Sequence, residues 1–407
     1  MKKELVLLSL IILASIIFIK PNVEWDEYVY LLNGKYFAGE EVYFESMRPP
    51  MLQLIVSLFY FFNIENLIFL IIPLLCFAFF VFCFYLFSKD LRALIIMFCF
   101  PIFLMYIEKL MTAIFATSFV LLSLFFMKEY FLKKKDLFFY LSYLISGLVF
   151  LTRYPLGINL VVITLIYFLF EKKRDYFKVF LGLIVFCLPI IFWFNYMGLD
   201  SALSALNYVD VESGFFYYFQ NVLIILGFSF LFLLFLKDYK YEKKDLFFII
   251  PLVLFFLVFQ FINHKEPRYL IPLLPFVAVL FSKIMKNNKH FFVLSLVFFI
   301  SALIFSIVFF NSLCDNTENF NELHDFFLNK GKLMVLSNYW PAVAYYSNNS
   351  VLAISEPCNI NKSVIDSNAS YIVVSSFNPC FNSDYSNYEL IKVINNNSCE
   401  IINIYKI

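Results

Sequence analysis

Apolar runs about as long as a bilayer is thick recur through the first three quarters of this chain. Two of them extend from Leu67 to Phe87 and from Phe291 to Phe310, and about twenty residues of α-helix cross the hydrocarbon core of a membrane. Of the 407 residues, 62% are hydrophobic and only 15% are charged, which is more apolar surface than a soluble domain of this length can bury. The sequence therefore predicts a multi-pass membrane protein of mainly α-helical fold.

The first apolar run, Leu5 to Ile19, follows Met1-Lys2-Lys3 and has two readings, a cleaved signal peptide or a retained span. The residues after it are Lys20-Pro21-Asn22-Val23, which do not form a small-residue cleavage site. We interpret this run as a retained first span.

The distribution of positive charge indicates which runs cross the membrane. Residues 51–62 are short for a span, and Gln53, Ser57 and Tyr60 share one helical face, a pattern typical of an interfacial helix. If this stretch stays at the surface, the basic loops all fall on the side of Lys2 and Lys3, as the positive-inside rule requires; these loops are 89–92, 128–136, 171–178, 237–245 and 283–290. We expect a cytoplasmic N-terminus, an external C-terminus and eleven spans, at 5–19, 67–87, 93–107, 110–127, 137–151, 155–170, 179–197, 215–236, 246–262, 269–282 and 291–310.

Residues 311–407 differ in character and predict a small external α/β domain. Their apolar runs have strand length, at 333–336, 371–374, 390–394 and 401–405, and helical stretches are expected at 318–329 and 341–346. The predicted domains are therefore 1–310, a transmembrane domain whose external loop 21–66 carries the interfacial helix 50–62, and 311–407.

Two features agree with an external position of this tail. Four Asn-x-Ser sequons occur, although an Asn- and Ser-rich segment also produces them by chance, at Asn348, Asn361, Asn368 and Asn396. Four cysteines permit two disulfides in three pairings, the alternative being four free thiols: Cys314, Cys358, Cys380 and Cys399. The other four cysteines lie within spans, where cysteine is a small apolar residue.

Ionisable residues gather at the external ends of the predicted spans. They lie in Glu24-Trp25-Asp26-Glu27-Tyr28, in Arg48-Pro49-Pro50, in Glu108-Lys109, in Thr152-Arg153-Tyr154-Pro155 and in His264-Lys265-Glu266-Pro267-Arg268-Tyr269. Charges placed against a span are costly, so each is a candidate for function. The alternative is that they snorkel to water and set topology, which we favour for Lys109 alone.

The signs of these charges indicate a chemistry. An external Arg153 opposes the positive-inside bias, and three cationic groups on one face fit an anion such as a lipid phosphate. Sugar transfer to a hydroxyl needs a base for the acceptor proton and cations for a departing phosphate. Asp26 and Glu27 are candidates for the base and its orienting residue, the alternative being an exposed acidic loop.

The residues that carry this chemistry also carry a family resemblance. Trp25-Asp26-Glu27-x-x-Tyr-Leu-Leu, followed by Arg48-Pro49-Pro50, resembles the C-type glycosyltransferase (GT-C) superfamily, nearest to the protein O-mannosyltransferases and the lipid A aminoarabinose transferases. The stretch from His264 to Tyr269, with Pro272 and Pro275 after it, is also similar to a motif of the α-mannosyltransferases that use dolichyl phosphate mannose. The resemblance covers roughly residues 20 to 280.

The resemblance implies a polyprenyl-phosphate sugar donor and inversion at the anomeric carbon. It implies that Asp26 is the base and that Glu108 is the second acidic residue, which opens a later span. We expect the donor phosphate to be bound by Arg153, His264, Lys265, Arg268 and Arg48. This chain has Arg48 where many relatives have His, and Glu108 where Asp is common. A divalent metal remains possible, with Asp26 and Glu108 as its ligands.

Two other classes remain as alternatives, a lipid-linked sugar transporter or flippase and a non-catalytic membrane protein of cell-envelope assembly. Transporters tend to have internal repeats and broken helices at the midplane, and we find no evident repeat. The acceptor can be a protein, a glycan or a lipid. Nucleic acid is not an expected partner, since no basic patch is interleaved with aromatic residues in a soluble segment, and no Walker-type loop indicates a nucleotide.

Overall fold

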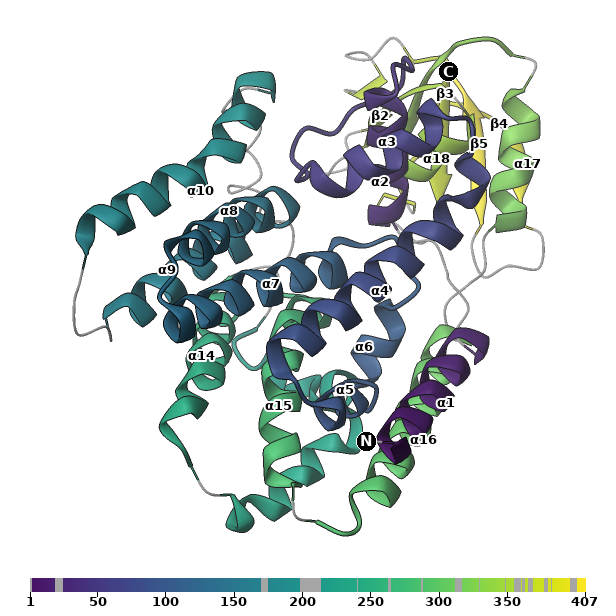
Figure 1. Cartoon of the computed structure of the whole chain (residues 1–407). Coiled ribbons are helices and arrows are strands. Elements are labelled where there is room, and N and C mark those ends of the chain that lie inside the picture. The colour runs from purple at the N-terminus through teal and green to yellow at the C-terminus, as the bar shows by residue number, and fades with distance from the viewer. Residues whose placement is uncertain are drawn as a thin grey trace. The chain divides into compact units, whose positions relative to one another are not determined.

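The chain forms two compact units, each described by itself below (Figure 1). The first unit contains residues 1–21, 46–52 and 69–310, and the second contains 22–45, 53–68 and 311–407. The computed structural model describes residues 2–18, 25–169, 175–197, 214–239, 241–262, 265–286, 288–311, 317–328, 330–347, 349–354, 360, 363–364, 369–376, 380–381, 383–395 and 401–407.

The first unit is helical throughout its described length. Its elements are α1 (Lys2–Phe18), α4 (Ile68–Ser88), α5 (Leu91–Met97), α6 (Pro101–Tyr106), α7 (Thr112–Lys133), α8 (Asp136–Thr152), α9 (Tyr154–Leu169), α10 (Tyr176–Met197), α12 (Tyr217–Gln220), α13 (Val222–Leu226), η2 (Gly227–Asp238), η3 (Lys243–Asp245), α14 (Leu246–Phe261), η4 (Pro267–Leu273), α15 (Leu274–Ile284) and α16 (Phe291–Asn311).

The multi-pass architecture is confirmed. Six helices in the described part of the chain are long and apolar enough to cross a membrane, at 65–88, 112–133, 176–196, 243–261, 267–284 and 291–309. Shorter apolar helices accompany them at 4–15, 51–61, 136–152, 154–169 and 222–237. The count of eleven spans stays a prediction.

Two of the predicted spans are broken rather than continuous. The run 93–107 is divided into α5 and α6, and Pro101 opens α6, a position that proline's fixed φ suits. The run 215–236 is divided into α12, α13 and the 3₁₀ segment η2 at Gly227, whose φ of +57° favours glycine. A Cβ at Gly227 would stand 2.9 Å from the ring of Pro101, so the two breaks are packed against each other.

Aromatic residues and a few buried hydroxyls hold the helices of the first unit together. Phe rings fill much of its core, as at Phe80, which lies 5.0 Å from Phe103 between ring centroids. Between α7 and α8, the hydroxyl of Ser123 lies 3.0 Å from that of Ser142 and 3.1 Å from that of Ser146. Such hydrogen bonds join helices in an apolar environment, where no water is present to compete.

The second unit contains a five-stranded mixed sheet in the order β2-β1-β3-β5-β4. The strands are β1 (Met334–Ser337), β2 (Ser350–Ala353), β3 (Tyr371–Ser375), β4 (Glu389–Ile394) and β5 (Ile402–Lys406), and the helices of this segment are α17 (Thr317–Phe327) and α18 (Trp340–Ser347). β1 is parallel to β2 and β3, whereas β5 is antiparallel to β3 and β4. The predicted α/β character is confirmed, and β2 is the strand that the sequence reading missed.

Residues 25–45 and 53–68 belong to the same compact unit as this sheet. They contain α2 (Trp25–Phe37), most of α3 (Met51–Phe61) and η1 (Glu65–Leu67). The ring of Trp25 stacks on Tyr339 at 5.2 Å, and Tyr28 lies 5.7 Å from Tyr346. These contacts join residues more than 300 positions apart. The domain bounds expected from the sequence, with loop 21–66 assigned to the transmembrane domain, stay a prediction.

The short helix predicted at 50–62 is present as α3, and the orientation of its polar face differs from that of a surface helix in water; its interfacial position stays a prediction. Gln53, Ser57 and Tyr60 are buried, whereas Leu58 and Phe61 are 54% and 68% exposed. A helix that turns its polar stripe to protein and its apolar side chains outward suits a lipid environment more than water.

Most of the predicted modification sites lie outside the described residues. This holds for the four sequons and for Cys314, Cys358 and Cys399. Cys380 is disulfide-bonded, whereas the four cysteines of the helical unit are free thiols, at Cys76, Cys83, Cys99 and Cys187.

We expect Gly34→Ala to destabilise the second unit by about 1–3 kcal/mol, the usual cost of overpacking. A Cβ at Gly34 would stand 2.4 Å from a methyl carbon of Val56, where α2 packs on α3. Limited proteolysis and thermal unfolding of the purified protein measure the effect. The double variant Gly34→Ala/Val56→Ala is the control, because it removes the clash; if it is no more stable than Gly34→Ala alone, the predicted contact is wrong.

Candidate active site

Three junctions between helices bring ionisable side chains together at one end of the first unit. They are the α6–α7 turn with Glu108 and Lys109, the α8–α9 break at Arg153, and the segment before η4. The junction cluster is defined as Glu108, Lys109, Arg153, Lys265, Glu266 and Arg268. Lys109 and Lys265 are 4% and 7% exposed, so this is not a set of solvated loop charges.

Arg268 is held in place by two neighbours. Its Nη2 donates to Oε1 of Glu266 at 2.7 Å, and its Nε pairs with the other carboxylate oxygen. Its Nη1 donates to Sδ of Met111 at 3.2 Å, which ties η4 to the start of α7. A two-pronged contact of this kind is the arrangement in which a guanidinium also binds a phosphate.

Arg153 lies where one helix ends and the next begins. Its backbone is extended, with φ −160°, and its N–H donates to the carbonyl of Val149 at 2.7 Å to close α8. Its guanidinium lies over the ring of Tyr269, 4.4 Å from the centroid, and 5.9 Å from that of Phe259. The planar cation stacks on an aromatic face, and this contact joins the α8–α9 break to η4.

The Glu108–Lys109 turn holds two ionisable groups with displaced pKa values. Burial raises the pKa of Glu108 to about 7. Burial, and after it the positive charge of Arg268, lowers the pKa of Lys109 to about 7. The Lys109 ammonium also lies 5.2 Å from the centroid of the Tyr106 ring. The sequence reading favoured a topogenic Lys109, but the residue is buried and interacts with the cluster.

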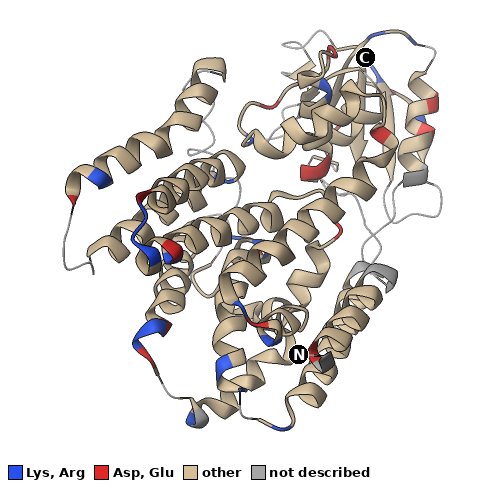
Figure 2. Ribbon diagram, in the orientation of Figure 1, with Lys and Arg blue, Asp and Glu red and all other residues tan. Residues whose placement is uncertain are grey.

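The basic loops lie at the other end of the same helices. α7 runs from Thr112, beside the junction cluster, to Lys133, and its 22 residues span about 33 Å, close to the thickness of a bilayer core. α8 ends at the cluster and begins at Asp136, and α15 begins near the cluster and reaches Lys283. Figure 2 marks the charges at the helix ends. The lysine-rich loops and the junctions of the cluster alternate along the sequence, and they lie at opposite ends of one helical bundle.

The two acidic candidates of the first loop belong to the second unit. Asp26 and Glu27 occupy the first turn of α2 and are 8% and 1% exposed. Carboxylates in the first turn are stabilised by the helix dipole, so these are not an exposed acidic loop. After α2 the chain is held by Asn33, whose amide exchanges two hydrogen bonds with the backbone of Glu45, at 2.8 and 2.9 Å.

Two further predicted site residues, Arg48 and His264, add little to the geometry of the site, whereas Glu266 and Lys35 have contacts that the sequence does not predict. Arg48 lies partly buried in the turn before α3, and His264 lies outside the described residues. Glu266, the partner of Arg268, lies in the stretch from His264 to Tyr269, and the sequence alone predicts no role for it. Lys35 of α2 has its ammonium 4.7 Å from the Tyr345 ring centroid, and burial lowers the pKa of Lys35. The sequence around Lys35 does not predict this contact or this burial.

A metal site is not apparent in the described part of the chain. No three His, Cys, Asp or Glu side chains there are grouped so as to hold an ion. The two suggested ligands, Asp26 and Glu108, belong to different compact units. A role for a divalent ion stays a prediction.

Residues 191–327 match the Alg9-like mannosyltransferase family, and this stretch includes Lys265, Glu266 and Arg268. An uncharacterized protein of Aquifex aeolicus (strain VF5) is 30% identical over 211 residues, which is 46% of this chain and 41% of that protein. The chain thus spans about two fifths of the length of this relative.

Solved structures match nearly the whole chain. ArnT from Cupriavidus metallidurans in the apo state has a TM-score of 0.69 and 11% identity, covering 95% of this chain and 93% of that one. ArnT bound to undecaprenyl phosphate has a TM-score of 0.66 and 11% identity, covering 97% of each chain. The chain has the fold of ArnT. The predicted resemblance is thereby confirmed, and the neighbour is a lipid A aminoarabinose transferase, one of the two branches that the sequence motifs favoured.

We expect anion binding at the junction cluster to weaken as pH rises through about 7. Above that pH Lys109 loses its proton and Glu108 becomes negative, and both changes oppose an anion. If binding requires the charged lysine, the affinity falls about ten-fold between pH 6 and pH 8 for Lys109 alone. The measurement is a titration with a polyprenyl phosphodiester, whose own charge is constant over this range.

The control is Glu108→Gln/Lys109→Arg, which keeps a fixed charge at both positions. This variant should bind with little pH dependence, since arginine stays protonated. An unchanged pH profile in the double variant would assign the titration to other groups.

Proposed function

We propose that this protein is a C-type membrane glycosyltransferase that moves a sugar from a polyprenyl-phosphate carrier to an acceptor hydroxyl at the external membrane face, with inversion. The observation that carries the proposal is the junction cluster, where charges from three sequence-distant junctions meet at one end of the helical unit. A protein of the same fold has been solved bound to undecaprenyl phosphate. The Alg9-like mannosyltransferase match over 191–327 supports the same reaction class.

In the proposed reaction, Asp26 accepts the proton of the acceptor hydroxyl. The oxygen then attacks the anomeric carbon on the side opposite the phosphate. The bond between that carbon and the phosphate oxygen breaks, and its electron pair leaves with the polyprenyl phosphate. Glu27 orients the base, and Glu108 positions the acceptor.

The cations stabilise the departing phosphate. We assign Arg153, Lys265 and Arg268 to this role, with His264 and Arg48 as further members of the set. Fixed donors aimed at a growing charge are worth most where water is excluded, and the burial of Lys265 and of the Arg268 stem favours such a site. Glu266 neutralises Arg268 when no donor is bound, and a phosphate would take over its place as the counterion.

The proposed orientation follows from the charges. The lysine-rich loops and the N-terminus are cytoplasmic, and the junction cluster and residues 311–407 are external, because Lys and Arg accumulate on the cytoplasmic side. We assign the sheet domain a scaffolding or acceptor-side role. A flippase or transporter is the second candidate, and it would also handle a lipid phosphate with cations. An assay for transfer from polyprenyl-phosphate sugars in membranes that contain the protein separates the two.

Asp26→Asn should lower transfer by about 10² to 10⁴, the usual contribution of a general base, with donor affinity unchanged. The assay measures transfer to a panel of acceptors, and donor binding is measured separately. Glu41→Gln is the matched control, because Glu41 lies in the same loop, is exposed and pairs with Lys332 at 2.9 Å. Normal turnover by a well-folded Asp26→Asn protein would refute the assigned base.

Arg268→Ala and Glu266→Gln should change donor affinity in opposite directions. Loss of the guanidinium removes a charged contact of about 1.5–3 kcal/mol, which weakens donor binding roughly ten-fold to a hundred-fold. Loss of the Glu266 charge frees Arg268 for the phosphate and should tighten binding. Equal weakening by both variants would mean that the pair serves structure alone.

A further inference from the structure

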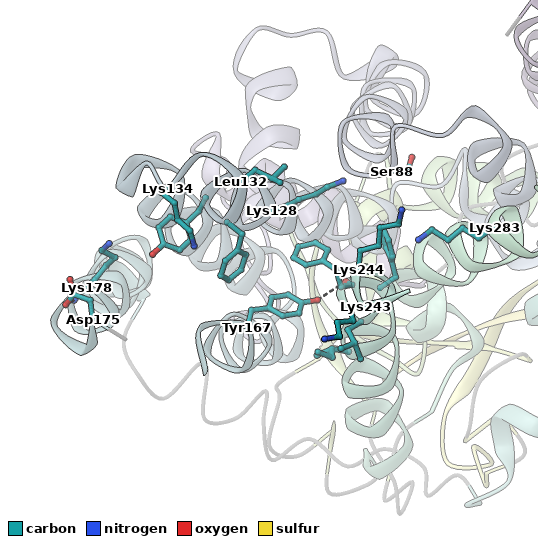
Figure 3. Close-up of a pocket in the computed structure, with 16 residues that line it drawn as sticks. Ser88, Lys128, Leu132, Lys134, Tyr167, Asp175, Lys178, Lys243, Lys244 and Lys283 are labelled. Carbon is teal, nitrogen blue, oxygen red and sulfur yellow. Dashed lines mark hydrogen bonds between the residues drawn. The ribbon is translucent and has the colours of Figure 1, made fainter. Parts of the chain in front are cut away.

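A large cavity opens among the basic loops, at the end of the helical unit opposite the junction cluster. Its volume is about 1340 Å³, above the usual range for small-molecule sites. Six lysines from the ends of α7, α10, η3 and α15 line it: Lys128, Lys134, Lys178, Lys243, Lys244 and Lys283. Figure 3 shows them around one space.

Acidic residues balance only part of this charge. Lys178 pairs with Asp136 at 2.6 Å, and Lys283 pairs with the buried Asp245. Of the described acidic residues, Asp175 lines the cavity itself. Lys244 pairs with Glu242, which is not part of the lining. Glu129, next to Lys128 in the sequence, interacts with it electrostatically, so among the described residues six lysines share five nearby carboxylates.

Like charges are held close together at this cavity. Lys128 on α7 interacts electrostatically with Lys283 on α15, and Figure 3 shows Lys128, Lys244 and Lys283 extending toward a common region. The Lys128 ammonium donates to the carbonyl of Phe87 at 3.0 Å. Ammonium groups gathered in this way repel one another, and a shared anion removes the repulsion.

The other walls of the cavity are apolar. Phe131, Leu132, Phe247 and Ile250 line it, and Tyr167 beside them donates its hydroxyl proton to the carbonyl of Phe247 at 2.8 Å. That bond satisfies the polar tip of Tyr167, whose ring stacks on that of Phe247 with 4.6 Å between centroids. The lining therefore has a cationic part and a hydrocarbon part, as an amphiphile has.

We propose that this cavity is a binding site for an anionic membrane lipid, with the phosphate of its headgroup among Lys128, Lys244 and Lys283 and part of its chains along the aromatic wall. Basic pockets between membrane helices on the cytoplasmic side bind phosphate headgroups in this manner. The positive-inside rule accounts for an excess of Lys and Arg in the basic loops as a whole. Here six of these lysines line one cavity. The site is separate from the junction cluster by the length of α7 and does not depend on the proposed transfer reaction.

The test uses the full chain in detergent, titrated with phosphatidylglycerol or with phosphatidylcholine and monitored by native mass spectrometry. Lys128→Gln/Lys244→Gln removes two cavity charges without unpairing the buried Asp245. Lys133→Gln/Lys135→Gln is the matched control, because it removes the same charge from the same end of the bundle but not from the lining. With about 1 kcal/mol for each lysine, the first double variant should bind phosphatidylglycerol roughly 25-fold more weakly.

The expected result is selective binding of phosphatidylglycerol that the control variant retains. Equal losses in both double variants would mean general surface attraction and would overturn the site. Equal binding of phosphatidylcholine would remove the role of the lysines. Displacement of the bound lipid by inorganic phosphate at millimolar concentration would assign the cavity to a water-soluble anion instead.

Discussion

The cost of placing charge against hydrocarbon organises the helical unit. With charge scarce and spans long, ionisable groups are confined to the places where one helix ends and another begins. The helices α7, α8, α9, α14 and α15 each have two ends at which ionisable groups can lie. Packing of these helices brings residues that are distant in the sequence together at those ends. The junction cluster and the lysine-lined cavity are both products of this confinement, one at each end of the bundle.

The two ends of the helical bundle differ in how their charges are held. Arg268 is fixed by Glu266 and Met111, and Arg153 is fixed by the Tyr269 ring. These contacts limit rotamer freedom before any ligand arrives, so less entropy is lost when one binds. The cavity lysines are longer, more flexible groups, which suits a ligand whose chains vary more than its phosphate.

Sequence reasoning predicted the features that depend on local pattern and on composition. The strands β1, β3, β4 and β5, the helices α17 and α18 and the short α3 follow from periodicity and turn residues. It did not predict what depends on tertiary contact. The division of 215–236 at Gly227 depends on the neighbouring Pro101, and the membership of α2 in the sheet domain depends on Tyr339 and Tyr346. Likewise, the spacing of Glu266 and Arg268 does not show whether the carboxylate of Glu266 is solvated or paired with Arg268.

The aromatic contact between α2 and the sheet domain has a consequence for biosynthesis. Tyr28 and Tyr346, whose hydroxyls lie 3.5 Å apart, are separated by 318 positions. The ribosome therefore produces the acid-bearing helix long before its packing partners, and the whole helical bundle is inserted in between. Contacts of such long range form late. A nascent or truncated chain would carry Asp26 and Glu27 on an unsupported helix, so completion of the carboxylate half of the proposed site is linked to completion of translation.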